Sequence, residues 1–290
     1  PRGHYCLCSE SSPWEWTWRR VNRGTDRGVP AVDDKTSASV TYLRYDGRQS
    51  SRTERPVVRE APWTIHVNDQ ELVTLFCTPE KLNFLVLGFL AAEGVIDGLD
   101  DVLLLQVCED QEGVIDVKLD EREFSLPSRP ILLSGCGRGV TFDDLSGRQR
   151  IIESSLEVPA EQISRLMRDL HHQAEIHQAA GGTHASALSD GERLLVVAED
   201  VGRHNTLDKI RGECLFREIP TKDRLLLTTG RISSEMVIKA AKMEVPIVAS
   251  RSSPTDLALN LARDWQMTVV GYVRGGKMNI YTRPERVLLR

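Results

Sequence analysis

Residues 134–139 read SGCGRG, a single cysteine between two glycines with an arginine two positions later. Glycines on both sides allow backbone conformations that other residues avoid, and they leave no side chains to shield the sulfur. The Arg138 guanidinium would favour the thiolate, which is the reactive form of a cysteine. The pattern therefore predicts that Cys136 is a nucleophile or a sulfur carrier. The alternative is a buried thiol that only packs, as most free cysteines do.

The other cysteines indicate neither a disulfide framework nor a structural metal site. Cys6 and Cys8 have C-x-C spacing instead of C-x-x-C, and no second pair stands nearby to complete a zinc site. Cys77 and Cys108 lie in apolar stretches, which predicts core or near-core positions. A thiol-redox protein is the least favoured class, because Cys214 could approach the glycine-flanked cysteine only through the fold.

Charge and composition exclude several classes of protein. Residues 1–60 hold 11 Lys and Arg against 8 Asp and Glu, which leaves 26 against 34 in the rest of the 290-residue chain. This acidic body does not suit a nucleic-acid groove. No apolar run is long enough to span a membrane, and the amino terminus does not read as a secretory signal, so we expect a cytoplasmic protein. Residues 1–57 are expected to form a mobile tail.

A small α+β domain is predicted over residues 58–150, ending in the cysteine loop. Two strands join at an Asn-Asp turn at 68–69, and a Thr-Pro pair at 78–79 is typical of a helix start. The apolar stripe that follows stops at Gly94, and a further strand pair completes the domain.

A helix is predicted over residues 159–178, and three histidines lie on it. His171, His172 and His177 are poorly spaced for one metal ion, because neighbours and i, i+5 pairs do not share a helix face. We therefore interpret them as a solvated helix surface. His184 differs from these, since it follows the helix at the start of the next element.

The last hundred residues alternate regularly between strand and helix patterns, which is typical of a mainly parallel α/β sheet. Ligands of such sheets bind beyond the carboxyl ends of the strands, where helices begin. Three turns carry suitable groups: Asp200, Gly202, Arg203, His204 and Asn205; Gly230, Arg231, Ser233 and Ser234; and Ser250, Arg251, Ser252, Ser253 and Thr255. One such hydroxyl would be interpreted as a helix cap, but three arginine-bearing turns favour a phosphate-rich ligand. Walker and G-x-G-x-x-G sequences are absent, which disfavours a nucleoside triphosphatase or a standard dehydrogenase.

Five long motifs occur in order: GGTHASAL, EDVGRHNTLDKI, TTGRISSEMVIKAA, SRSSPTDLALNLA and GYVRGGKMNIYT. They closely resemble motifs of the FdhD family, the sulfurtransferases that serve as formate dehydrogenase accessory proteins. The resemblance runs from about residue 61 to residue 287. It includes VNDQELVTLFCTPEKLNFLVLGFLAAEGVI, which fits the opening domain of the family.

The resemblance implies a carrier that takes sulfur from a cysteine desulfurase as a Cys136 persulfide. The sulfur then passes to the molybdenum bis(molybdopterin guanine dinucleotide) cofactor, a bound substrate that GDP would mimic, for use by formate dehydrogenase. The resemblance also implies a homodimer and a cytidine-deaminase-like α/β/α domain over residues 151–290. Deamination is not expected, since the H-x-E and P-C-x-x-C elements of zinc deaminases do not occur. The cofactor-contacting segment of the family corresponds here to Tyr272, Val273, Arg274, Gly275, Gly276 and Lys277.

One departure from the family pattern concerns the loop. Many members carry C-x-x-C, whereas the position three after Cys136 is Gly139. We expect the single cysteine to suffice, with Arg138 stabilising the thiolate and the persulfide. The alternative function is a non-catalytic chaperone that binds the molybdenum cofactor without transferring sulfur.

Overall fold

The computed structural model describes residues 35–108, 113–120, 131–133, 139–141 and 151–289. All of them belong to one contact unit, Ala31–Arg290. Within it are two larger sheets with separate apolar cores, joined by a helix–helix contact.

The first described element is a β-hairpin. Strands β1 (Ser37–Tyr45) and β2 (Ser50–Val58) pair antiparallel as a two-stranded ribbon. The Asp46 carboxylate accepts hydrogen bonds from the amides of Arg48 and Gln49, both at 2.9 Å, and so closes the turn. This hairpin was not predicted from the sequence, because its turn at Asp46 and its strand pairing have no strong local pattern.

The smaller sheet has the strand order β4-β3-β6-β5 and confirms the predicted strands. Its strands are β3 (Ala61–Val67), β4 (Gln70–Cys77), β5 (Val102–Cys108) and β6 (Val114–Leu119). Asn68 and Asp69 both have positive φ, as a tight two-residue hairpin turn requires. A 3₁₀ turn, η1 (Leu99–Asp101), leads into β5.

Helix α1 (Leu82–Ala92) packs against this sheet, but it begins later than the Thr-Pro pair predicted. Thr78 is buried and does not cap the helix, because its Oγ1, the atom that would accept from the helix backbone, accepts a hydrogen bond from the Val201 amide at 3.2 Å. The helix ends before Gly94, whose φ of +70° confirms the predicted stop.

The larger sheet has six strands in the order β11-β10-β12-β13-β14-β15. Strands β12, β13 and β14 pair in parallel, whereas β10 runs antiparallel to both of its neighbours and β15 antiparallel to β14. The sheet is thus mixed, not mainly parallel. Its strands are β10 (His184–Ser189), β11 (Leu194–Asp200), β12 (Leu225–Thr228), β13 (Ile247–Ser250), β14 (Thr268–Arg274) and β15 (Lys277–Thr282).

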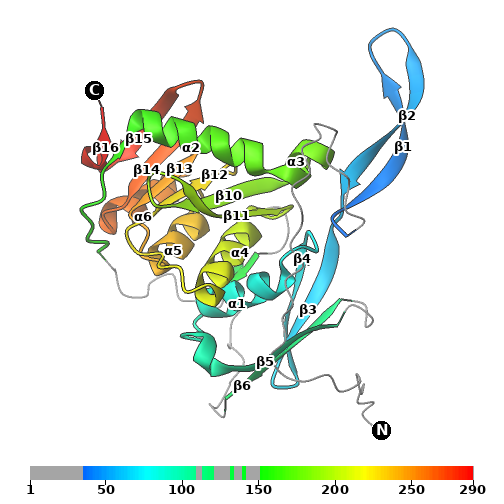
Figure 1. Cartoon of the computed structure of the whole chain (residues 1–290), viewed down its shortest axis with the longest axis horizontal. Helices are drawn as coiled ribbons and strands as arrows, with labels where there is room; N and C mark the ends of the chain where they lie inside the picture. The colour runs from blue at the N-terminus through cyan, green and yellow to red at the C-terminus, as the bar shows by residue number, and fades with distance from the viewer. Residues whose placement is uncertain (1–34, 109–112, 121–130, 134–138, 142–150, 290) are drawn as a thin grey trace. The chain divides into compact units, whose positions relative to one another are not determined.

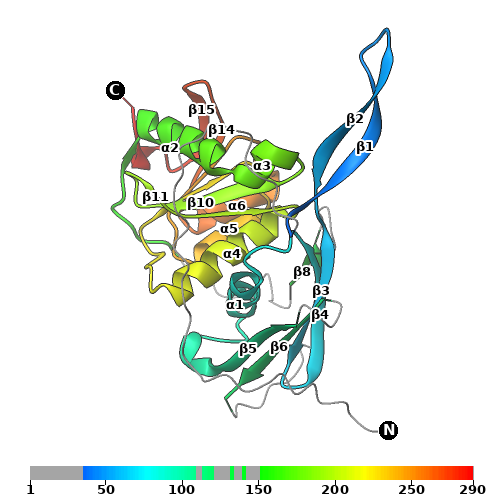
Figure 2. The same cartoon turned by 45° about the vertical axis from the view of Figure 1, so that its right-hand side comes forward.

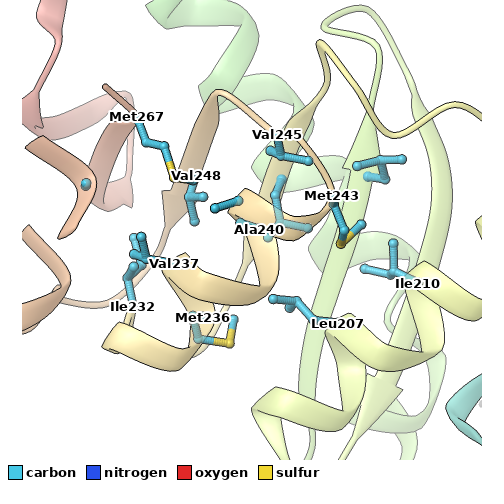
Figure 3. Packing of buried hydrophobic residues seen from close by; sticks show 14 of the residues in the cluster. Leu207, Ile210, Ile232, Met236, Val237, Ala240, Met243, Val245, Val248 and Met267 are labelled. Atoms are coloured by element: carbon cyan, nitrogen blue, oxygen red, sulfur yellow. The ribbon is translucent and has the colours of Figure 1, made fainter. Parts of the chain in front are cut away.

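Helices cover both faces of this sheet (Figure 1). Helix α2 (Ala160–Gln173) packs on one face, and α4 (Arg203–Phe216), α5 (Ser234–Lys242) and α6 (Asp256–Asp264) pack on the other. The two cores use alternate residues of one strand, since Leu226 belongs to the α4–α6 side and its neighbours Leu225 and Leu227 to the α2 side. Figure 3 shows part of the α4–α6 core, where Leu207, Met236 and Val248 are labelled. Short strands β7 (Ile131–Leu133), β8 (Gly139–Thr141), β9 (Val158–Pro159) and β16 (Val287–Leu288) and the 3₁₀ turn η2 (Pro284–Arg286) complete the described elements.

The helix predicted over residues 159–178 is broken in two. Helix α3 (Glu175–Ala180) starts after Ala174, which is buried and has non-helical backbone angles. The amides of Ile176 and His177 both donate to the Glu199 carboxylate at 2.8 Å. A carboxylate from β11 therefore caps the second helix and decides where the break falls.

Helices α1 and α4 join the two halves of the described chain, and they lie side by side in Figures 1 and 2. Gly88 of α1 faces Gly212 of α4, and a Cβ on Gly88 would fall 2.6 Å from the carbonyl carbon of Asp208. Only glycine permits this backbone approach.

Candidate functional site

The three predicted turns gather at one edge of the larger sheet. Strands β11, β12, β13 and β14 run in the same direction, so their carboxyl ends meet there. Hydrogen bonds join successive turns: Ser250 Oγ donates to the Gly230 carbonyl at 2.5 Å, and the Tyr272 amide donates to the Ser252 carbonyl at 3.0 Å. The edge is therefore one connected structure, as ligand sites of α/β sheets are.

The β14–β15 hairpin closes this edge on one side. Gly275 and Gly276 form its two-residue turn and both have positive φ, which a tight primed turn requires. Tyr272 also has positive φ, 56°, at a register irregularity in β14, and its side chain is 44% exposed. A non-glycine residue in this conformation costs free energy, which is typical of functional segments.

A pocket of about 290 Å³ lies between helix α2 and this hairpin. The Arg274 side chain crosses to the neighbouring turn, where its Nε donates to the Arg251 carbonyl at 2.8 Å. The Ser164 hydroxyl is buried without a hydrogen-bond partner. The pocket is lined by Ser164, Met167, Arg168, His171, His172, Arg251, Val273, Arg274, Gly275 and Gly276.

The charge of this lining is positive. Three arginines and two histidines contribute to it and no acidic side chain does. The pKa of His171 is lowered, first by burial and then by the charge of Arg251. Arginines are suited to bidentate contact with phosphate oxygens, so the pocket suits a phosphorylated ligand.

The histidines of α2 were missed as site residues. His171 and His172 are exposed, in agreement with their interpretation as part of a solvated helix surface, and they also line this pocket. Their spacing in the sequence shows which face of their own helix they occupy, but not which other element that face meets. The packing of α2 across the sheet brings them opposite the hairpin about a hundred residues later, and no sequence signal marks that contact.

The first turn divides into structural and candidate binding groups. Asp200 Oδ2 lies 2.7 Å from Lys209 Nζ, and both side chains are fully buried. The Asn205 amide donates to the Phe76 carbonyl at 2.9 Å and to Asp200 Oδ1 at 2.8 Å. Asn205 therefore ties β4 to α4 and has no free donor for a ligand in this arrangement.

Arg203 and His184 flank Gly230, where the first two turns meet. A Cβ on Gly230 would fall 3.0 Å from Arg203 Cβ and 3.4 Å from His184 Nδ1. The pKa of His184 is lowered by burial and then by the neighbouring Arg203 and His204 charges. Any side chain at position 230 would therefore crowd Arg203 and His184.

The starts of α4 and α5 meet through three side chains. His204 Nε2 lies 3.2 Å from Ser233 Oγ, and His204 Nδ1 lies 3.0 Å from Glu235 Oε2. Burial lowers the pKa of His204 despite the Glu235 carboxylate. Burial acts to raise the pKa of Glu235, but the contact with His204 and two nearby cations outweighs it, so the pKa is lowered. Glu235 was missed because only the packing of α5 beside α4 reveals its contact.

The third turn mainly supports its own backbone. Ser250 is fully buried and its hydroxyl also accepts a hydrogen bond from the Ser252 amide at 2.9 Å. Thr255 caps α6 by accepting from the Ala258 amide, which is the alternative already raised for such hydroxyls. The remaining predicted residues are partly or fully accessible: Ser234 and Ser252 are half-buried, and Arg231 and Lys277 are exposed.

The predicted nucleophile Cys136 and its neighbour Arg138 lie outside the described residues. Strands β7 and β8 stand on either side of them in the chain, and Leu133 pairs with Gly139. Cys77 and Cys214 are buried, and burial raises the pKa of each thiol to about 12, so neither is a thiolate at neutral pH.

The described part of the chain contains no group of three His, Cys, Asp or Glu residues placed to hold a metal ion. Among its helices, none combines the length and apolar character needed to cross a membrane.

Comparison with known proteins agrees with these features. The model of the FdhD/NarQ family matches residues 58–288. The chain is 38% identical to the sulfur carrier protein FdhD of Bacillus subtilis, over 88% of this chain and 99% of that one. It is 40% identical to the protein of the same name from Bacillus pumilus, over 89% and 98%. The crystal structure of "a putative formate dehydrogenase accessory protein from Desulfotalea psychrophila" superposes with a TM-score of 0.72 at 27% identity, over 87% of this chain and all of that one. With a family match across both sheets and the turns that connect them, the chain belongs to the FdhD/NarQ family.

Proposed function

We propose that this protein is a sulfur carrier in the maturation of formate dehydrogenase. Relatives about 40% identical over nearly their full length are named sulfur carriers, and the matching crystal structure is named for a formate dehydrogenase accessory protein. The cargo we propose is sulfane sulfur from a cysteine desulfurase, carried on Cys136 and delivered to the molybdenum bis(molybdopterin guanine dinucleotide) cofactor.

The observation that carries the proposal is the positive pocket between α2 and the β14–β15 hairpin. Its hairpin wall holds Arg274, Gly275 and Gly276, which belong to the segment expected to contact the cofactor. A volume of about 290 Å³ is small for the whole dinucleotide cofactor and suits one phosphorylated arm of it. We therefore place a guanine nucleotide arm in this pocket, with Arg251 and Arg274 on its phosphates.

The first step of the sulfur transfer that we propose is an exchange without net oxidation. The Cys136 thiolate attacks the outer sulfur of the desulfurase persulfide, a new S–S bond forms, and the desulfurase cysteine leaves as a thiolate. In the second step the outer sulfur of the Cys136 persulfide passes to the bound cofactor, the S–S bond breaks and the Cys136 thiolate returns, and a thiol reductant supplies the two electrons that bring the transferred sulfur to the sulfide level. Binding of the nucleotide arms makes this second step effectively intramolecular, so the protein contributes mainly by positioning.

Three further features belong to the same proposal. A homodimer would present two cysteine loops to one large cofactor. The protein would act in the cytoplasm, where desulfurase and client enzyme meet. The larger sheet lies between two layers of helices, which is compatible with a cytidine-deaminase-like fold. The proposed function does not depend on that similarity of fold.

The test combines sulfur loading with nucleotide binding. We expect incubation with a cysteine desulfurase and cysteine to add one sulfur atom to the SGCGRG peptide, and we expect reduction to remove it. In calorimetry, Arg274→Ala should weaken GDP binding by about 10- to 100-fold, because a charged hydrogen bond contributes about 1.5–3 kcal/mol. Lys222→Ala is the matched control, since the ion pair of this exposed cation within the described residues is with Glu244, at 3.7 Å on the surface.

The two alternatives give different results. If Cys136→Ala still activates formate dehydrogenase while GDP binding persists, the protein is a cofactor chaperone and not a sulfur carrier. Equal GDP affinity of the Arg274→Ala and Lys222→Ala variants would contradict the placement of the nucleotide arm.

A further inference from the structure

The contact between the starts of α4 and α5 has an arrangement that phosphate binding does not require. His204 lies between a hydroxyl and a carboxylate: Nε2 is 3.2 Å from Ser233 Oγ, and Nδ1 is 3.0 Å from Glu235 Oε2. A nucleophile within reach of a base, with the base held by a third group, is the general pattern of covalent catalysis by serine.

We propose that Ser233 is a nucleophile for acyl transfer, with His204 as its general base and Glu235 as the residue that positions His204. The substrate class is a carboxylic ester or thioester. This activity is separate from sulfur transfer and does not use Cys136.

The hydroxyl of Ser233 is available for this role. Ser233 stands at the N-cap of α5, a position where a serine side chain ordinarily accepts a hydrogen bond from the helix backbone, yet it makes no such bond. Its one hydrogen bond in the described structure is to His204. The residue is half-buried, so a substrate can reach it from solvent.

The surroundings favour the required protonation states. The pKa of His204 is lowered by burial, which leaves its ring neutral and able to accept a proton at neutral pH. The pKa of Glu235 is lowered by its contacts despite burial, so it is a carboxylate. Glu235 Oε2 is buried and accepts no hydrogen bond within the described residues, and the His204 ring, with Nδ1 at 3.0 Å, is the donor that stands within reach of it.

The start of α5 can stabilise the charge that develops on the substrate. The Val237 amide makes the first hydrogen bond of the helix, to the Ser233 carbonyl. The amides of Ser234 and Glu235 precede it and have no intrahelical acceptor, as at every helix start. Amides beside a nucleophile act as an oxyanion hole.

The reaction balances without an external oxidant or reductant. Ser233 Oγ forms a bond to the carbonyl carbon while its proton moves to His204 Nε2. The bond from carbon to the leaving oxygen or sulfur then breaks, and that proton moves to the leaving group. A water molecule, activated by His204 in the same way, releases the acid and restores Ser233. The exposed Arg231, two residues before the nucleophile, favours substrates with a negative charge.

The experiment is labelling of the full-length protein with a fluorophosphonate, a probe that reacts with activated serines, followed by peptide mass spectrometry. We expect the label on Ser233. Ser233→Ala should abolish it, and His204→Gln should slow labelling by at least about 100-fold, in keeping with the usual contribution of a general base. Ser51→Ala, which removes an exposed hydroxyl from strand β2, is the control and should label at the wild-type rate.

The positioning role of Glu235 is tested by a pH profile, which a merely structural effect of the substitution would not shift. The charged groups around His204 are Glu235 and Lys239 from α5, Arg203 from α4 and His184 from β10. Of these, Glu235 alone favours the protonated ring. In Glu235→Gln the rise of the labelling rate with pH should therefore move to lower pH, together with a lower maximum rate, at an unchanged melting temperature.

Three outcomes would overturn the proposal. One is no label on Ser233 in protein that is folded by circular dichroism. Another is label that falls on Ser234 or elsewhere. The third is labelling of Ser233 at an undiminished rate in the folded His204→Gln variant. Labelling that persists in Cys136→Ala would support the proposal and separate it from sulfur transfer, and labelling that depends on Cys136 would contradict it.

Discussion

Replacing Gly88 by alanine tests the contact that joins the two halves of the described structure. The added Cβ would fall 2.6 Å from the carbonyl carbon of Asp208 and 2.8 Å from the amide nitrogen of Gly212. Both neighbours are backbone atoms of α4, so no side-chain rotation can relieve the overlap. The carbon–carbon contact alone requires a separation of about 0.9 Å to restore its optimal distance of about 3.5 Å, and the Asp208 carbonyl oxygen, which lies closer still to the added Cβ, requires more.

The loss of folding stability follows from this separation of the helices. A gap of about 0.5–1 Å forfeits a quarter to a half of the dispersion energy of each contact across the helix pair. Overpacking of a core costs about 1–3 kcal/mol, and the rigid neighbours here put Gly88→Ala at the upper end. Alanine stabilises a helix interior by about 1 kcal/mol relative to glycine, which offsets part of this loss. The free energy of unfolding should therefore fall by about 2 kcal/mol, which lowers the melting temperature by about 4–8 °C.

Urea unfolding followed by circular dichroism, together with thermal melts, measures this change. Gly98→Ala is the control, because a Cβ there meets nothing within 4 Å, and its stability should stay within about 0.5 kcal/mol of wild type. Gly212→Ala should cost as much as Gly88→Ala, and the double variant should cost less than the sum, since the first separation makes room for the second methyl group. If Gly88→Ala were more stable than the wild-type protein by the helix propensity alone, the close approach of α1 and α4 would be refuted.

Further predictions concern the charged groups. Lys209→Met should destabilise the protein by about 3–5 kcal/mol in urea unfolding, because it leaves Asp200 buried without its cation; a loss below 1 kcal/mol would show that the pair is not desolvated. Burial and the Arg251 charge hold the pKa of His171 below its ordinary value. The affinity for GDP should therefore rise as the pH falls through this lowered pKa, because protonated His171 adds a positive charge to the pocket, and His171→Gln should flatten this dependence in calorimetry; an unchanged pH profile would place the phosphates elsewhere. Arg138→Ala should slow alkylation of Cys136 by iodoacetamide at neutral pH, and an equal rate would exclude thiolate stabilisation by Arg138.

Sequence patterns predicted most of the elements in both halves. The Asn-Asp turn, the strand pairs around it and the strand–helix alternation after His184 all depend on local chemistry, and all are present. The errors occurred where distant groups compete with local preferences. Thr78 would cap a helix in isolation, but the Val201 amide donates to its hydroxyl, and Glu199 sets the break between α2 and α3.

The candidate site was predicted in part, for a similar reason. Turns at the carboxyl ends of strands that run in one direction must share an edge, so placing the three turns together needed only the order of the elements. Which of their side chains face a ligand could not be predicted. Ser250 and Asn205 have the same hydrogen-bonding groups as accessible residues, but backbone carbonyls of neighbouring segments already use them.

By itself the sequence determined the family, the order of strands and helices, and the location of the glycine-flanked cysteine, because these depend on residue types at short and regular spacing. The tertiary structure alone decided that the α2 histidines oppose the β14–β15 hairpin, and that Ser233, His204 and Glu235 converge. Those contacts join residues far apart in the chain, and their geometry depends on how helices pack across a sheet, which residue types and spacing do not encode locally.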